Sequence, residues 1–152
     1  MADTAKKIAM GSDHAGYNLK KYLADKLKEK GYEIVDVGTN STERVDYPVY
    51  GREAAEKVAA GNCDMGILVC GSGVGMCMTA NKVCGVRALV CTEPFSAKMS
   101  RMHNNSNVLC LGERIVGIEM AWEIVTTWLA TPFEGGRHAA RVEMIESCLD
   151  DE

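Results

Sequence analysis

A regular alternation between short apolar runs and longer segments of helical character constrains the fold more than any other feature. The five apolar runs occupy residues 8–11, 32–38, 65–71, 86–91 and 107–112. Such runs are typical of strands buried on both faces, and strands joined through helices pair in parallel. The sequence therefore predicts an α/β fold: a single three-layer α/β/α domain with a five-stranded, Rossmann-like parallel sheet, helices on both faces and a C-terminal helix.

The segments between the runs carry helix signals of their own. Residues 18–30 place Leu19, Tyr22, Leu23 and Leu27 on one apolar stripe, and Gly31 follows as the helix stop. Further helices are expected over 51–61, 75–85 and 117–130. A last helix is expected over 135–152, where Val142, Ile145 and Leu149 repeat at helical spacing.

Length and composition indicate an ordinary globular chain. The 152 residues fit one domain, and we expect residues 1–152 to form it. The apolar runs are too short to cross a bilayer, and the N-terminus lacks the apolar stretch of a secretory signal. We therefore expect a cytoplasmic protein with no membrane partner.

Charge and cysteine usage exclude two further classes of partner. The net charge is -4, and no stripe of lysine and arginine is interleaved with aromatic residues, so nucleic acid is not expected as a partner. The seven cysteines form no C-x-x-C pair. This argues against a disulfide framework and against a zinc site, and free thiols fit a reducing compartment.

A glycine-rich stretch, CGSGVG at 70–75, follows the third apolar run. In parallel sheets, ligands bind beyond the carboxyl ends of the strands, and glycines there let backbone N–H groups converge on an anion. The anion could be a phosphate or a developing oxyanion, or the glycines could serve only a tight turn. The helix dipole supplies roughly 0.3 to 1 kcal/mol toward a Cys70 thiolate, so a further donor or cation must help it. The alternative is that Cys70 is a small buried hydrophobe.

Other chemistry-bearing residues lie near predicted element ends. Asp13 and His14 follow the first strand, and His103 ends the helix before the fifth. Arg137 and Arg141 are four apart, so their guanidinium groups share one side of a helix and suit a phosphate monoester. The plainer alternatives are a capping aspartate, a histidine that stabilises the helix dipole, and a solvated basic face.

Several short motifs, in order along nearly the whole chain, resemble the ribose-5-phosphate isomerase B family, which also contains galactose-6-phosphate isomerase subunits. They are GSDHAG (11–16), ERVDYP (43–48), CGSGVG (70–75), ANK (80–82), EP (93–94), HNNSNVL (103–109) and GGRHAARV (135–142). The resemblance implies an α/β/α fold, a phosphorylated sugar as substrate, no metal and no other cofactor. It also implies a homodimer or homotetramer whose active site is shared between subunits.

The resemblance assigns roles residue by residue. Cys70 matches the general base, Ser72 a hydroxyl implicated in ring opening, and His103 the acid-base that opens the furanose ring. The backbone of Gly71, Gly73, Val74 and Gly75 resembles the anion hole for the enediolate. Substrate contacts match Asp13, His14, Tyr47 and Asn104, and the phosphate positions match His14, Arg114, Arg137 and Arg141. Met76 stands where one branch of the family has a glutamate, which places this chain with the cysteine branch.

The expected reaction is the interconversion of D-ribose 5-phosphate and D-ribulose 5-phosphate through an enediolate, in the non-oxidative pentose phosphate pathway. Three alternatives remain at this point. One is a hexose-6-phosphate isomerase acting on galactose or allose 6-phosphate. The others are a non-catalytic nucleotide-binding module, for which the P-loop lysine is missing, and a subunit that only scaffolds a catalytic partner.

Overall fold

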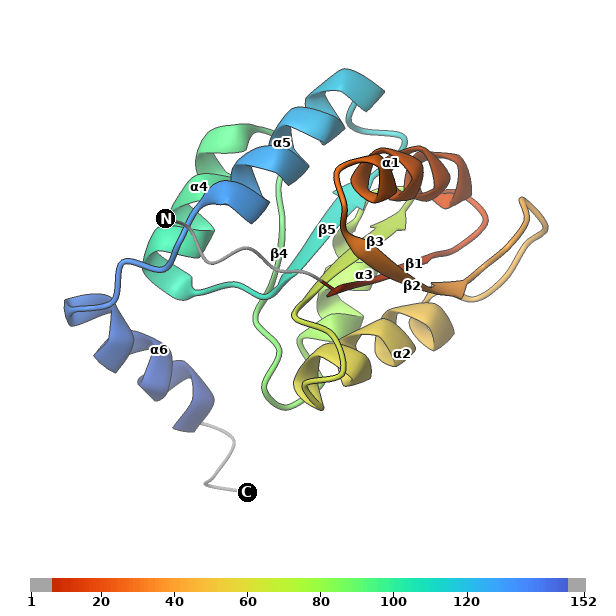
Figure 1. Ribbon diagram of the computed structural model, residues 1–152. Coiled ribbons are helices and arrows are strands. Elements are labelled where there is room, and N and C mark those ends of the chain that lie inside the picture. The colour runs from red at the N-terminus through yellow and green to blue at the C-terminus, as the bar shows by residue number, and fades with distance from the viewer. Residues whose placement is uncertain (1–6, 148–152) are drawn as a thin grey trace.

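The computed structural model describes residues 7–147, which form one sheet between two layers of helices (Figure 1). All the strand pairs are parallel, and the strand order is β2-β1-β3-β5-β4. The strands are β1 (Lys7–Ser12), β2 (Glu33–Gly38), β3 (Met65–Cys70), β4 (Ala88–Val90) and β5 (Val108–Gly112). The helices are α1 (Tyr17–Glu29), α2 (Tyr47–Ala59), α3 (Val74–Ala80), α4 (Pro94–Asn104), α5 (Ile118–Ala130) and α6 (Arg137–Ser147). The predicted fold class and strand number are confirmed.

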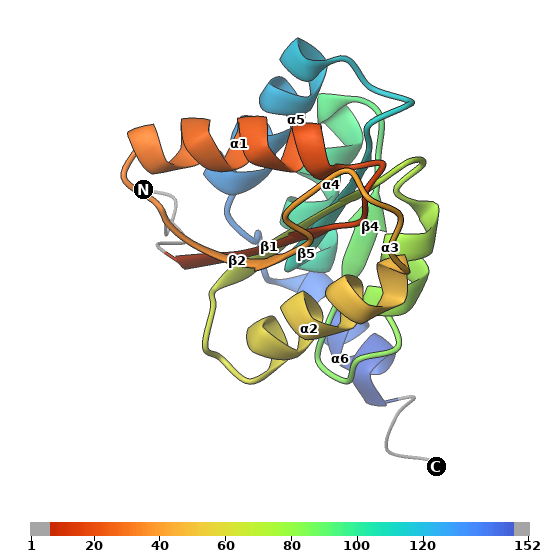
Figure 2. The ribbon, with the colours of Figure 1, turned by 90° about the vertical axis from the view of Figure 1, so that its right-hand side faces the viewer.

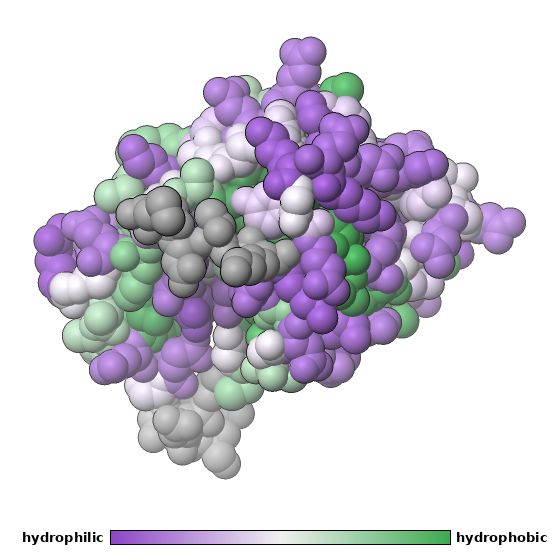
Figure 3. Space-filling model, in the orientation of Figure 1, coloured by the Kyte–Doolittle hydropathy of each residue, from purple (hydrophilic) through white to green (hydrophobic). Residues whose placement is uncertain are grey.

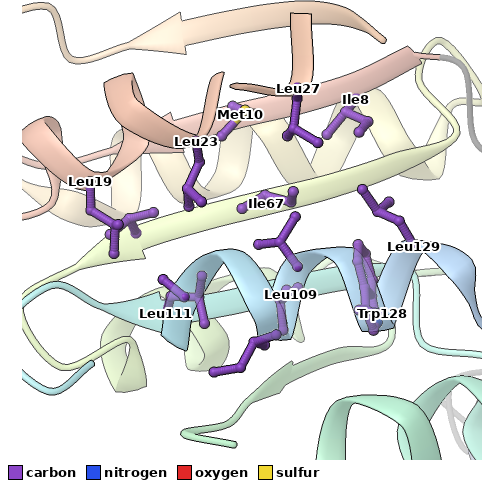
Figure 4. Close-up of a cluster of buried hydrophobic side chains, with 14 of the residues drawn as sticks. Ile8, Met10, Leu19, Leu23, Leu27, Ile67, Leu109, Leu111, Trp128 and Leu129 are labelled. Carbon is purple, nitrogen blue, oxygen red and sulfur yellow. The ribbon is translucent and has the colours of Figure 1, made fainter. Parts of the chain in front are cut away.

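Alternation along the strands divides the core between the two faces of the sheet. Ile67 and Val69 of β3 face the cluster built with α1, α4 and α5, and Leu68 and Cys70 face the cluster built with α2 and α3. All six residues of β3 are buried, as expected for the middle strand of the sheet. Figure 4 shows the larger cluster, in which Trp128 of α5 packs beside Leu109.

The outer surface differs sharply from this core. The face seen in Figure 3 is mostly hydrophilic, with small apolar areas between the polar side chains. Within the described residues, no helix combines the length and the apolarity needed to cross a membrane.

Two helix boundaries differ from the prediction. Helix α2 begins at Tyr47 instead of residue 51, because Pro48 occupies the first helical turn, where its missing N–H is not needed. Helix α3 ends at Ala80, and the prediction that it runs to 85 is wrong. The Asn81 side chain donates to the carbonyl of Ala88 (3.0 Å) and accepts from its N–H (2.8 Å), which fixes the chain against β4.

Helix α6 stands apart from the sheet, at the lower left of Figure 1 and below the strands in Figure 2. It contacts the end of α4. Of the three residues predicted to form its apolar stripe, Val142 is half-buried and Ile145 is exposed, whereas Leu149 lies outside the described residues. The stripe therefore does not pack into the core of this chain.

Candidate active site

A cavity of about 520 Å³ opens at the carboxyl edge of the sheet, where β1, β3 and β5 end. It brings together most of the predicted site residues: Asp13, His14, Tyr47, Cys70, Gly71, Ser72, Val74, Gly75 and Arg114. Met78 and Ile115 complete its wall and were not predicted, because apolar residues at a rim look like any other exposed hydrophobe. The prediction that this edge carries the site is consistent with the cavity.

Cys70 is the last residue of the middle strand and is only 4% exposed, with its side chain at the cavity. The N–H of Gly73 donates to the Cys70 sulfur at 3.1 Å. Gly73 has a φ of 81°, and a Cβ there would lie 2.8 Å from a side-chain carbon of Val90. Only glycine brings the backbone to this position, where its N–H is directed at the Cys70 sulfur.

The loop also positions a hydroxyl beside the thiol. The N–H of Val74 donates to the Ser72 oxygen at 3.2 Å, so that oxygen is an acceptor within the loop. The hydroxyl proton remains available to a ligand, because a serine hydroxyl both donates and accepts. Two consecutive backbone donors are thus directed at the two reactive side chains.

Tyr47 covers the far side of the loop. A Cβ on Gly75 would lie 2.7 Å from carbons of the Tyr47 ring, so the missing side chain is what lets the ring approach. Tyr47 is the first residue of α2 and is 40% exposed, which leaves one side of its ring at the cavity.

The turn after β1 supplies an acid and an imidazole. Asp13 is 7% exposed, and its Oδ1 accepts from the N–H of Gly16 (3.0 Å), so one oxygen stabilises the turn. The N-cap of α1 is Gly16, so Asp13 is not the helix cap of the plainer alternative. His14 Nδ1 accepts from the N–H of Val45 (3.2 Å). The proton of the neutral imidazole is therefore on Nε2, which can donate to an anion.

Arg114 lies just beyond β5, with its side chain exposed. Its N–H donates to the carbonyl of Gly71 (3.0 Å), and a Cβ on Gly71 would lie 3.5 Å from its Nη1. The neighbouring Glu113 accepts a hydrogen bond from the backbone N–H of Leu19 in α1. Glu113 was not predicted; its carboxylate links α1 to the segment that carries Arg114.

The remaining predicted residues lie elsewhere on the chain. His103 and Asn104 end α4, close to where β5 begins, whereas Cys70 pairs with Gly112 at the other end of β5. At about 3.3 Å per residue, the length of β5 alone separates the two sites by roughly 13 Å. A single chain does not bring His103 to Cys70.

His103 instead packs against α6. Its ring stacks on that of His138, with centroids 4.2 Å apart and planes 16° from parallel. Arg137 and Arg141 lie exposed on the same helix. The structure therefore divides the predicted residues into two groups, one at the cavity and one around the end of α4.

The ligand atoms of His103, Glu134 and His138 lie within 4.8 Å of one another. A zinc ion lies about 2.0 to 2.1 Å from each imidazole nitrogen, close to the ring plane. Because the two rings are stacked nearly parallel, no such point lies in both planes. The geometry is that of a ring stack, and it does not suit a metal ion.

The sequence did not predict a buried charged side chain near the site. Lys20 is 1% exposed, and its ammonium donates to Asp36 Oδ1 (2.8 Å) and to the carbonyl of Thr39 (2.6 Å). Thr39 in turn donates its N–H to the carbonyl of Ser12 (2.8 Å), next to Asp13. The helical spacing of Lys20 was the available signal, because this residue lies seven residues before Leu27 and so falls on the apolar stripe of α1.

The thiol of Cys77, in α3, has a lowered pKa. Hydrogen bonds from the Cys110 thiol and then from the Asn81 amide lower the pKa of Cys77 to about 7, against its partial burial. Burial raises the pKa of Cys110 well above its ordinary value. The sequence did not single out Cys77, because thiol acidity depends on neighbours that only the fold brings together.

Comparisons with known proteins identify the family. The family model described as Ribose/Galactose Isomerase matches residues 8–145. The chain is 54% identical over 140 residues to ribose-5-phosphate isomerase B of Escherichia coli, covering 92% of this chain and 94% of the relative. It is 42% identical over 139 residues to a D-erythrulose-4-phosphate isomerase of Pectobacterium atrosepticum, covering 91% of each chain.

Solved structures give the same result. Ribose-5-phosphate isomerase B of Clostridium thermocellum superposes with a TM-score of 0.94 at 54% identity, covering 95% of this chain and 98% of the other. The Mycoplasma genitalium enzyme, solved with bound ribulose-5-phosphate, superposes with a TM-score of 0.92 at 41% identity, covering 96% and 97%. With nearly the whole sequence matched in both comparisons, the chain belongs to the ribose/galactose isomerase family.

Proposed function

We propose that this protein is a ribose-5-phosphate isomerase that interconverts D-ribose 5-phosphate and D-ribulose 5-phosphate through an enediolate. The observation that carries the proposal is the cavity in which the Cys70 sulfur, the Ser72 hydroxyl and the side chains of His14 and Arg114 meet. The names of the similar enzymes from Escherichia coli and Clostridium thermocellum support this substrate. We further propose that it works in the cytoplasm, in the non-oxidative pentose phosphate pathway, where its free thiols would persist.

In the proposed mechanism, Cys70 takes the proton from C2 of the open-chain aldose. The C–H electron pair forms the C1–C2 double bond, and the carbonyl electrons move to O1 to give the enediolate. The proton on O2 then passes to O1, the C1–C2 π electrons take the proton from Cys70 at C1, and O2 is left as the ketone oxygen. We assign stabilisation of the developing charge to the backbone N–H groups of the loop at 71–75 that are not directed at Cys70 or Ser72, and one such donor is worth roughly 2.7 to 4 kcal/mol in comparable oxyanion sites.

Phosphate binding and ring opening require side chains that the cavity of a single chain does not supply. His14 Nε2–H and Arg114 supply donors there, whereas His103, Asn104, Arg137 and Arg141 lie around the end of α4. We propose a homodimer, or a tetramer of such dimers, in which the end of α4 and helix α6 of one subunit complete the cavity of the other. The separation along β5 supports this arrangement, because it prevents His103 from serving its own Cys70.

Turnover of a panel of sugar phosphates by the purified chain tests the substrate. The kcat/KM for ribose 5-phosphate should exceed those for galactose, allose and erythrulose phosphates. Cys70→Ala should lower kcat by about 10² to 10⁴, the range for a positioned acid-base group. The matched control, Cys84→Ala, alters an exposed thiol and should leave kcat unchanged. A Cys70→Ala variant with a near-normal rate would remove the thiol from the mechanism.

Mixing two inactive variants tests the shared site. In a dimer, Cys70→Ala spoils the cavity of its own chain, and His103→Asn spoils the cavity of the second subunit. Random reassociation makes half of the dimers mixed, with one intact site each, so about a quarter of the wild-type activity should return. Failure to recover activity after verified subunit exchange would place both residues in one chain's site and contradict the arrangement.

A further inference from the structure

We propose that His138 is a positioning residue. Its neutral imidazole stacks on His103 at the end of α4, and this contact holds helix α6, with Arg137 and Arg141, in place. The inference rests on the proposed function, because it takes from there the roles of His103 and of the two arginines. His138 itself was not among the predicted site residues.

The burial pattern of α6 places its attachment at one side chain. His138 is 5% exposed and is the buried residue of this helix between 137 and 147. Its ring lies 4.2 Å from the His103 ring, nearly parallel to it. Two contacts assist: Glu134 N–H donates to the carbonyl of Met102 (3.1 Å), and Arg87 pairs with Glu146 at 2.5 Å near the far end of α6. The stack is the contact that includes a catalytic candidate.

Helix geometry links the directions of the Arg137 and Arg141 side chains to the direction of the His138 side chain. At about 100° per residue, Arg137 lies roughly 100° and Arg141 roughly 60° from His138, both toward the same side of the helix. When His138 faces α4, both guanidinium groups therefore leave the helix on one side and remain exposed. A rotation of α6 about its axis would move both of them together.

The charges around His138 favour its neutral form. His103 faces it from α4, Arg137 and Arg141 lie on its own helix, and Glu134 is the opposing carboxylate in the preceding loop. Burial first, and then His103 and Arg137, lower the pKa of His138, while Glu134 opposes the shift. His138 Nε2 is buried with no hydrogen-bond partner among residues 7–147. A cationic imidazole would need a partner there, because both of its nitrogens carry protons.

The stack of His138 on His103 should therefore weaken as the pH falls. Because folding favours the neutral imidazole, its contribution to stability is complete above the ordinary histidine pKa of about 6.5 and declines as the pH falls toward the lower folded value. Protonation adds a positive charge beside His103 and Arg137 and opposes the stack. Release of α6 would then raise KM for the sugar phosphate more than it lowers kcat.

Two substitutions separate the ring from its charge. His138→Ala removes the ring, and we expect it to raise KM for ribose 5-phosphate and Ki for inorganic phosphate by at least about tenfold, the loss of one charge-assisted contact. His138→Phe keeps a flat ring that cannot titrate. Its KM at pH 7.5 should stay within about threefold of wild type, and its rise in KM toward pH 5.5 should be smaller than in wild type. The control Glu143→Gln changes an exposed charge on the same helix and should alter neither.

A His138→Phe variant as impaired as His138→Ala, or one with the wild-type acid rise in KM, would overturn the inference. So would a His138→Ala variant with wild-type KM and Ki. Thermal unfolding between pH 7.5 and 5.5 supplies a readout that needs no turnover: wild type should lose more stability in acid than His138→Phe. If wild type isomerises no sugar phosphate, the proposed function fails. The unfolding comparison alone then decides whether the His103–His138 stack holds α6 in place.

Discussion

The buried ion pair between Lys20 and Asp36 yields a quantitative prediction about stability. The Lys20 ammonium is 1% exposed, whereas the Asp36 side chain is 37% exposed. Removing one member leaves the other without its counter-charge, but only Asp36 can then be hydrated. The two single substitutions should therefore differ in cost, although they break the same contact.

The expected magnitudes follow from this asymmetry. Asp36→Asn leaves a buried ammonium with no counter-charge, held only by neutral oxygens such as the Thr39 carbonyl, and should cost about 3 to 5 kcal/mol. Lys20→Met leaves a half-hydrated carboxylate that still accepts from the Gly38 N–H (2.8 Å), and should cost about 1 to 2 kcal/mol. The double variant holds no stranded charge, so adding Lys20→Met to Asp36→Asn should restore about 1 to 3 kcal/mol.

Urea unfolding of the four proteins, followed by circular dichroism at one fixed protein concentration, measures this cycle. The fixed concentration matters because assembly adds to apparent stability. The reasoning is refuted if Lys20→Met costs as much as Asp36→Asn, or if the double variant is less stable than Asp36→Asn alone.

Two further predictions concern the loop and helix α3. Gly73→Ala should cost at least about 2 kcal/mol in urea unfolding, since φ is 81° and the new Cβ meets a β4 side chain at 2.8 Å; Gly31→Ala, at φ 95° with nothing within 4 Å, should cost only about 1. Equal costs would show that backbone conformation alone matters. Iodoacetamide should label Cys77 with a midpoint near its pKa of about 7 and leave Cys91, whose pKa is about 11, unlabelled at neutral pH, as read by mass spectrometry. Cys110→Ala should raise the Cys77 midpoint, and an unchanged midpoint would disprove the thiol–thiol hydrogen bond.

The sheet was predictable because its signal is local. Each strand is a short apolar run, and a run such as 65–71 has little alternative to burial in the middle of a sheet. The end of α3 was not predictable in this way. Residues 75–85 continue a helical pattern, and the helix stops because Asn81 bonds to Ala88, a partner whose position depends on the completed sheet.

The candidate site was predictable in its parts more than in its assembly. Motifs identified the side chains, since Cys70 and its glycines lie together in sequence. That His103 lies at the opposite edge of the sheet from Cys70 follows from the direction of β5, which is a property of the fold. His138 became visible only when burial was known, because its stretch looks solvated, whereas Lys20 lies on the apolar stripe of α1 and its burial was open to prediction from helical spacing.

The place of α6 bears on how enzymes of this family diverge. The Cys70 sulfur lies at the end of β3, which has a neighbouring strand on either side, so a change there disturbs the core. The arginines lie on a peripheral helix that is attached through the His103–His138 stack, with the Arg87–Glu146 ion pair near its far end. A few substitutions around these contacts could shift α6 outward or inward without altering the sheet. The relatives, whose names carry sugars of different lengths, include a D-erythrulose-4-phosphate isomerase at 42% identity. On the proposed role of the arginines, such an attachment would let substitutions alter the position of the phosphate without changing the groups at the cavity.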